Sequence, residues 1–219
     1  MPNFFTVSIV AEVICFLVAV ICLLRARSLV WRSMVLYLLL TCVNEIAGKY
    51  IGKRYHNNQW LYNIFIFFEA GFTFTMLANL LGKYVNCKPI IIPGFAIFIV
   101  SHIYGLINPG FLSYDYVTCV IMSAMFVLYS LYYYYLLLKD DLYVDLKYSP
   151  EFWWVAGTLL FYFGDTGCNI FSKQLETITI GPNKGHLTYL IFKVLNIILY
   201  GCWSYAFICK KWLTTTSEV

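Results

Sequence analysis

The stretch Leu187–Ile208, which reads LTYLIFKVLNIILYGCWSYAFI, decides the fold of this chain. It is an apolar run of 22 residues, and an α-helix needs about 20 apolar residues to cross the hydrocarbon core of a bilayer. Lys193 stands inside this run. A lysine in such a position costs ~2.5–3.5 kcal/mol on insertion scales unless a partner compensates its charge. The stretch therefore predicts a membrane-spanning helix that carries part of a buried polar site.

The composition extends this prediction to the whole chain. Of the 219 residues, 61% are hydrophobic and 12% are charged, whereas soluble domains carry about 25% charged residues. Helices and closed barrels are the structures that can span a bilayer, and the alternating pattern of a barrel is missing. We therefore expect one all-α domain, residues 1–219, with seven transmembrane helices. The expected spans are residues 4–24, 31–51, 60–82, 89–107, 115–138, 151–171 and 186–209.

Two of the expected spans resemble each other at a fixed offset. Similar residues recur in the third and seventh spans: Tyr62, Ile64, Phe65, Glu69 and Lys83 align with Tyr189, Ile191, Phe192, Asn196 and Lys210. This match is consistent with a 3+1+3 parallel repeat, in which the fourth span joins two related groups of three. Parallel repeats of this kind occur among transporters. The alternative is chance similarity between two apolar segments.

The lysines and arginines of the short loops predict the orientation, because they favour the cytoplasmic side. With the N-terminus outside, nine lie on the inner side, namely Arg25, Arg27, Arg32, Lys83, Lys88, Lys139, Lys147, Lys210 and Lys211. Five lie on the outer side, namely Lys49, Lys53, Arg54, Lys173 and Lys184. We therefore expect the N-terminus outside and the C-terminus inside. No basic segment precedes the first apolar stretch, so we interpret it as a helix, with a cleaved signal peptide as the alternative.

Tryptophans stand at the ends of the expected spans. Their positions favour the aromatic belts that membrane proteins place at the two lipid–water interfaces. The five that we assign to these belts are Trp31, Trp60, Trp153, Trp154 and Trp212.

Polar side chains within the spans define a candidate binding site. On the last span, Tyr189, Lys193 and Asn196 share one helical face. Because lipid does not solvate such a face, we expect Lys193 to point into the bundle, with Asp165 or Glu69 within reach of an ion pair or a bridging water. The candidate ligand-binding residues are Glu69, Asp165, Lys193, Glu45, Asn196, Tyr62, Tyr189 and His102. The alternative is that these groups only bond neighbouring helices together.

The usual motifs of enzymes and metal sites are missing from the sequence. Its three histidines lack His-Glu-x-x-His spacing, and there is no Gly-x-Ser-x-Gly, P-loop or Rossmann pattern. Eight cysteines form no Cys-x-x-Cys pair, so we expect neither a disulfide framework nor a metal site. No cofactor is indicated, and no basic patch points to nucleic acid. An intramembrane hydrolase is the alternative if the protein is an enzyme.

These residues carry two resemblances to known proteins. A lysine on the last of seven helices and an acid on the third, here Lys193 and Glu69, are similar to microbial rhodopsins and imply a retinal-binding photoreceptor. The sixth span, WWVAGTLLFYFGD, departs from the retinal-pocket pattern of that family. The segments YNIFIFFEAGF (62–72) and KVLNIILYGCW (193–203) look like small seven-helix bacterial membrane proteins of unknown function. That resemblance implies an architecture and the cytoplasmic membrane of a bacterium.

Two classes of function fit these features. We expect a buried polar pocket that faces outward, binds a small molecule and transports it, or transports protons. The main alternative is a membrane receptor or sensor without enzymatic activity. Such a receptor needs a protein partner at the inner loops, for which the acidic group Asp140, Asp141 and Asp145 is the candidate.

Overall fold

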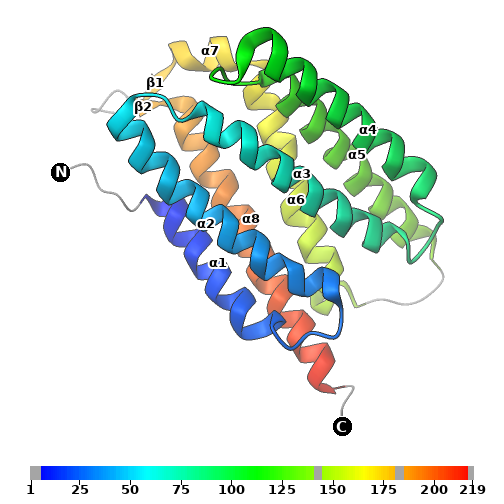
Figure 1. Cartoon of the computed structure of the whole chain (residues 1–219). Coiled ribbons are helices and arrows are strands. Elements are labelled where there is room, and N and C mark those ends of the chain that lie inside the picture. The colour runs from blue at the N-terminus through cyan, green and yellow to red at the C-terminus, as the bar shows by residue number, and fades with distance from the viewer. Residues whose placement is uncertain (1–5, 141–144, 181–184, 217–219) are drawn as a thin grey trace.

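The computed structural model describes residues 6–140, 145–180 and 185–216 (Figure 1). Seven long helices lie in this part of the chain: α1 (Val7–Leu23), α2 (Leu29–Tyr55), α3 (Gln59–Leu81), α4 (Lys88–Gly105), α5 (Tyr116–Lys139), α6 (Pro150–Ile170) and α8 (Leu187–Thr216). Each expected span falls on one of them, which confirms the helical segments predicted from the sequence.

A small irregular segment connects α6 to α8. It contains the short helix α7 (Ser172–Thr177) and two strands of two residues each, β1 (Thr179–Ile180) and β2 (Gly185–His186). The strands pair antiparallel, with Thr179 opposite His186. This hairpin is a minor departure from the expected all-helical fold.

Local signals explain where two of the helices begin. Asp115 precedes α5, and its Oδ1 accepts a hydrogen bond from the Thr118 amide at 3.1 Å. Ser149 precedes α6, and its Oγ accepts one from the Phe152 amide at 3.3 Å. These oxygens satisfy amides that have no partner inside the helix. Pro150, which lacks such an amide, occupies the first position of α6.

The helices form one bundle with α6 and α8 near its centre. α8 packs against α1 and α6, and α6 packs in turn against α5. α4 packs mainly against α5 and lies at an edge of the bundle (Figure 1). We call the end where α1, α3, α5 and α8 begin the N-terminal end, and the opposite end the C-terminal end (Figure 1).

Aromatic rings fill the core between α6 and α8. The rings of Trp154 and Trp203 stack with centroids 5.4 Å apart, and Trp203 Nε1 donates a hydrogen bond to the Trp154 carbonyl at 3.1 Å. Trp31 packs edge-on against Phe207. Because Trp154 is 0% exposed and Trp31 is 1% exposed, the expected interfacial position is wrong for these two residues.

The surface of the bundle suits contact with lipid. In the described residues, five helices are long and apolar enough to cross a membrane: α2, α3, α4 with the turn that follows it, α5 and α8. Large aliphatic side chains are exposed on the outside; on α4, Ile92 is 63% exposed and Val100 is 69% exposed. Soluble monomers rarely expose large contiguous apolar patches.

Candidate functional site

A cavity with four ionisable side chains lies at the N-terminal end of the bundle, between α1, α2 and α8. We call it the charged pocket, and its volume is about 200 Å³. Its lining residues are Thr6, Ser8, Ile9, Glu12, Glu45, Lys49, Tyr189, Phe192, Lys193, Asn196 and Tyr200. The pocket therefore brings together four residues of the candidate set, Glu45, Tyr189, Lys193 and Asn196, and adds Glu12 as a further acid.

Glu12 is the most deeply buried charged residue of the charged pocket. It is 3% exposed, and its Oε1 has no hydrogen-bond partner within the described parts of the chain. The Cys42 thiol, Glu45 and Lys49 are its polar neighbours. Leaving a buried acceptor unpaired typically costs ~1–3 kcal/mol, and more for a charged group. Glu12 Oε1 is therefore an acceptor that a ligand entering the pocket can satisfy.

Glu45 and Lys49 contribute a second acid and an amine from α2. They stand four residues apart and interact electrostatically, as expected for neighbours on one helical face. Lys49 Nζ also donates a 2.9 Å hydrogen bond to Thr6 Oγ1, which ties the end of α2 to the start of α1. These two residues therefore already have partners within the protein.

Lys193 reaches the charged pocket from α8. Its side chain is half-buried and lines the cavity. Asn196 stands three residues further along and donates a hydrogen bond to the Phe192 carbonyl at 2.8 Å. The shared face that the sequence predicts for Tyr189, Lys193 and Asn196 does lie along this pocket.

The structure does not contain the expected direct ion pair of Lys193 with Glu69 or Asp165 among its described residues, and a contact through a bridging water stays a prediction. Both acids instead contact neutral donors on other helices. The reason lies in the helix order: α1 and α2 flank the pocket face of α8, whereas Glu69 and Asp165 sit at the contacts of α3, α5 and α6.

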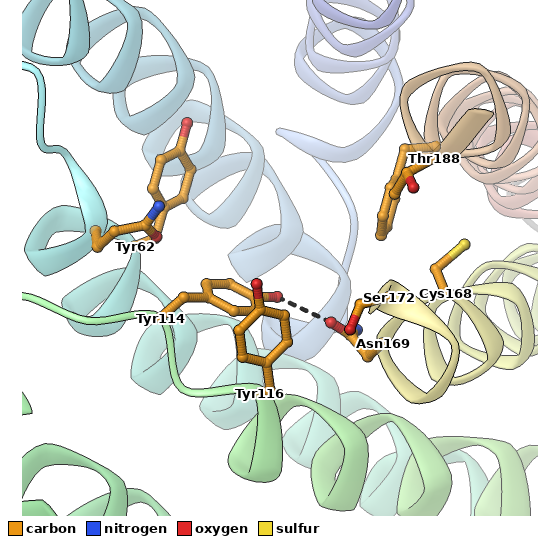
Figure 2. Close-up of a pocket in the computed structure, with 9 residues that line it drawn as sticks. Tyr62, Tyr114, Tyr116, Cys168, Asn169, Ser172 and Thr188 are labelled. Carbon is orange, nitrogen blue, oxygen red and sulfur yellow. Dashed lines mark hydrogen bonds between the residues drawn. The ribbon is translucent and has the colours of Figure 1, made fainter. Parts of the chain in front are cut away.

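A second cavity, the aromatic pocket, shares the lining residue Phe192 with the first; Figure 2 shows the residues that line it. Its volume is about 410 Å³. Its lining residues are Gln59, Tyr62, Tyr114, Tyr116, Cys168, Asn169, Ser172, Thr188 and Phe192. Lysine, arginine, aspartate and glutamate are missing from this lining. Tyr62 thus belongs to a different cavity from Lys193, and Phe192 belongs to both.

Hydrogen bonds connect the aromatic pocket to Asp165. The Tyr114 hydroxyl donates to Asn169 Oδ1 at 3.4 Å, as Figure 2 shows, and Asn169 Nδ2 donates to Asp165 Oδ1 at 2.9 Å. The Ser123 hydroxyl donates to Asp165 Oδ2 at 2.5 Å. Burial raises the pKa of the Tyr114 phenol, which stands just before α5 and stays a hydrogen-bond donor at neutral pH. A continuous polar path therefore runs from the cavity into the bundle.

Glu69, on α3, contacts α6 about one helical turn before Asp165. The Tyr162 hydroxyl donates a hydrogen bond to Glu69 Oε1 at 2.7 Å, and Tyr162 stands three residues before Asp165 on α6. Asp165 and Glu69 are close enough to interact electrostatically. These two acids have no lysine or arginine as an ion-pair partner in the described ranges.

His102 lies apart from both pockets. It is buried on α4 and its ring stacks on Phe98, with centroids 5.6 Å apart. Its Nδ1 and the Oδ2 of nearby Asp115 have no hydrogen-bond partner in the part of the chain that the structure describes. His102 is thus not brought together with Lys193 or with Asp165.

The C-terminal end carries a third cavity and an ion-pair cluster. The cavity has a volume of about 470 Å³ and is lined by Lys83, Tyr84, Val85, Leu136, Lys139 and Asp140. Glu151 Oε1 lies 2.9 Å from Lys83 Nζ and 3.5 Å from Lys210 Nζ. Of the acidic group expected to bind a partner, Asp140 lines this cavity, Asp145 caps a short 3₁₀ turn, and Asp141 lies outside the described residues.

Several residues of these sites escape sequence reasoning. Ser123 and Tyr114 look like an ordinary helix residue and an ordinary aromatic, because their role depends on Asp165 of another helix. Glu12 is visible as an acid near a helix start, but its burial depends on the packing of α1 against α8. An acid inside an apolar run was the usable signal for Glu12, since such residues seldom face lipid.

Comparison with known proteins finds no relative of this chain. No protein family, characterised protein or solved structure matches the chain.

Proposed function

We propose that this chain is an integral membrane protein that binds a small polar molecule in the charged pocket and carries it across the membrane. In this proposal all seven long helices cross the bilayer, with the N-terminal end outside. α1 and α6 join, as spans, the five helices that are long and apolar enough to cross a membrane, because both pack against α8 within the bundle. The 3+1+3 repeat stays a prediction. Helices that follow one another in the chain pack together in any bundle, so their contacts do not distinguish a repeat from a bundle without one.

One observation supports the binding of a ligand most directly. Glu12 and Lys193 come from two apolar helices and line the same cavity, and Glu12 Oε1 is buried without a partner in the described residues. Ionisable groups within membrane segments are costly, and they usually mark substrate or ion pathways. A site of this kind is better suited to binding than to holding helices together, because structural polar groups are normally paired.

The polar path below the aromatic pocket favours transport over sensing. Inside a bilayer, a carboxylate without a basic partner is compensated by a proton or by a bound cation. Asp165 and Glu69 are such groups, and the Tyr114–Asn169 hydrogen bond connects Asp165 with the aromatic pocket. We propose that this path serves the proton movement that drives the carrier. The receptor alternative would use the charged pocket for a signal and the C-terminal end for a protein partner.

The hydrolase and photoreceptor alternatives have less support. A hydrolase of the serine–histidine type needs a hydroxyl nucleophile in reach of a histidine, and the hydroxyls near the two pockets contact carboxylates or amides instead. A retinal Schiff base at Lys193 needs a counter-ion, and Glu69 contacts Tyr162 on another face of the bundle. We therefore keep binding and transport as the proposed function.

Uptake into liposomes tests this proposal. Liposomes that contain the purified protein are incubated with a mixture of small metabolites, and their contents are identified by mass spectrometry. The wild-type protein should accumulate at least one solute, and Lys193→Met and Glu12→Gln should not. Lys88→Met is the matched control, because Lys88 is exposed at the C-terminal end and lines neither of the two outer pockets.

The same liposomes separate the alternatives. Glu69→Gln keeps the shape of the side chain and should abolish the dependence of uptake on a pH gradient while the protein stays folded. A solute that the protein retains but never carries across would favour the receptor. If no solute is retained or carried by the folded wild-type protein, the proposed function is wrong.

A further inference from the structure

The charged pocket contains one carboxyl oxygen without a hydrogen bond and one amine without an ion pair, counted over the described residues. Glu12 contributes the acid: it is 3% exposed, lines the cavity and keeps Oε1 without a hydrogen bond to any described residue. The described parts of α1, α2 and α8 supply no hydrogen-bond donor to Glu12 Oε1. A ligand that completes the site should therefore carry such a donor, and a cationic donor would bind most strongly.

Lys193 contributes the amine, from α8. The structure gives its ammonium group no hydrogen bond and no ion pair to another described residue. A lysine ammonium has three donors and no acceptor. The group that complements it is therefore an anion, and a carboxylate is the simplest one.

The other charges of the pocket balance each other. Glu45 and Lys49 interact on α2, and Lys49 is further held by Thr6 Oγ1 at 2.9 Å. With Glu12 and Lys193, the lining contains two acids and two lysines. A ligand with a net charge would leave that charge unbalanced in a poorly solvated cavity, which is costly. A ligand with one positive and one negative group keeps the site neutral.

The size of the cavity limits the ligand. A volume of about 200 Å³ holds roughly six water molecules at ~30 Å³ each, or a solute with a similar number of non-hydrogen atoms. Alanine and β-alanine are of this size, and 4-aminobutyrate is slightly larger. Resting on the proposed function, we propose that the charged pocket binds a small zwitterion of the amino-acid type, with its ammonium group against Glu12 and its carboxylate against Lys193.

A panel of five compounds tests the charge pattern directly. Alanine, β-alanine and 4-aminobutyrate carry both groups at increasing separation, whereas propylamine and propionate each carry one. Binding of the radiolabelled compounds to the full chain in lipid nanodiscs is measured by equilibrium dialysis. At least one zwitterion should bind, and each single-charge compound should bind more than about tenfold more weakly, which corresponds to ~1.4 kcal/mol.

Two variants assign the two ends of the ligand. Glu12→Gln and Lys193→Met should each weaken binding of the best zwitterion by more than about tenfold, because each removes one partner of a charge pair. Glu12→Gln should leave the binding of propionate unchanged, and Lys193→Met should leave that of propylamine unchanged. Lys88→Met is a matched substitution outside the charged pocket and should bind the zwitterion as the wild type does.

Other results would overturn this inference without touching the proposed function. If propylamine or propionate binds as tightly as the best zwitterion, the pocket takes a singly charged ligand. If neither variant changes zwitterion binding, the ligand lies elsewhere. If the folded wild-type protein binds none of the five compounds, the assigned class is wrong, whereas the metabolite uptake described above still decides whether the protein binds and carries a solute.

Discussion

The hydroxyl of Tyr162 donates a 2.7 Å hydrogen bond to Glu69 Oε1, which joins α6 to α3 close to the middle of both helices. Neither residue has a basic neighbour as an ion-pair partner in the described chain. The hydrogen bond therefore holds α6 against α3. It also makes Tyr162 the principal protein partner of the Glu69 carboxyl group within the bundle.

Loss of this hydroxyl should destabilise the fold. Tyr162→Phe leaves the Glu69 carboxyl group without its donor, at a cost of ~1–3 kcal/mol. Thermal unfolding in detergent should show a lower midpoint than the wild type. Tyr162→Phe combined with Glu69→Met removes both polar partners and should be less destabilising than the sum of the two single changes. Strict additivity would mean that the hydrogen bond contributes nothing.

The ion-pair cluster at the C-terminal end should depend mainly on its shared acid. Glu151 contacts both Lys83 and Lys210, and its side chain is 14% exposed, whereas that of Lys83 is 48% exposed. Lys83→Met should cost less than ~1 kcal/mol, as for other exposed pairs. Glu151→Gln removes the charge that serves both lysines and should lower stability further, by ~1–3 kcal/mol. Added salt should narrow this difference, and equal effects of the two variants would argue against a shared role.

Close packing of α6 against α8 should make Gly157 intolerant of a side chain. A Cβ at this position would lie 2.8 Å from the Cβ of Cys202 and 3.2 Å from the Leu199 carbonyl oxygen. Gly157→Ala should therefore destabilise the bundle by ~1–3 kcal/mol. Gly167, on the same helix, has nothing within 4 Å of such a Cβ. Gly167→Ala should be neutral or stabilising by up to ~1 kcal/mol, and a similar loss in both variants would contradict this explanation.

The orientation in the membrane can be tested at the two termini. Seven spans place the termini on opposite sides, and the nine-to-five distribution of lysine and arginine predicts the C-terminus inside. Reporter proteins fused to each end should therefore report an external N-terminus and an internal C-terminus. Two fusions that report the same side would rule out an odd number of spans.

The sequence predicts the helices of this protein well, and the partners of its charges poorly. The length of an apolar run is a local property, so the segment around Lys193 appears as α8, which begins within one residue of the expected start and runs seven residues past the expected end. The partner of Lys193 depends on which helices flank α8 and on the face that each acid occupies. α8 packs against α1 and α6 rather than α3, and Asp165 of α6 is bonded by Ser123 of α5. Sequence spacing contains no information about that order.

The tryptophans illustrate the same limit. Trp154 and Trp31 stand near helix ends, which is where interfacial rings are expected. The structure buries both, because the end of α8 extends past them and supplies Trp203 and Phe207 as packing partners. The position of each tryptophan along its helix was predictable from the sequence. Whether the ring faces lipid or a neighbouring helix was not.

Phe192 gives the two outer pockets a common wall. Its side chain belongs to the lining of the charged pocket and of the aromatic pocket. A solute that pushed this ring out of one cavity would push it toward the other. Occupation of the first cavity would then set the room left in the second, as in an interlock between two compartments.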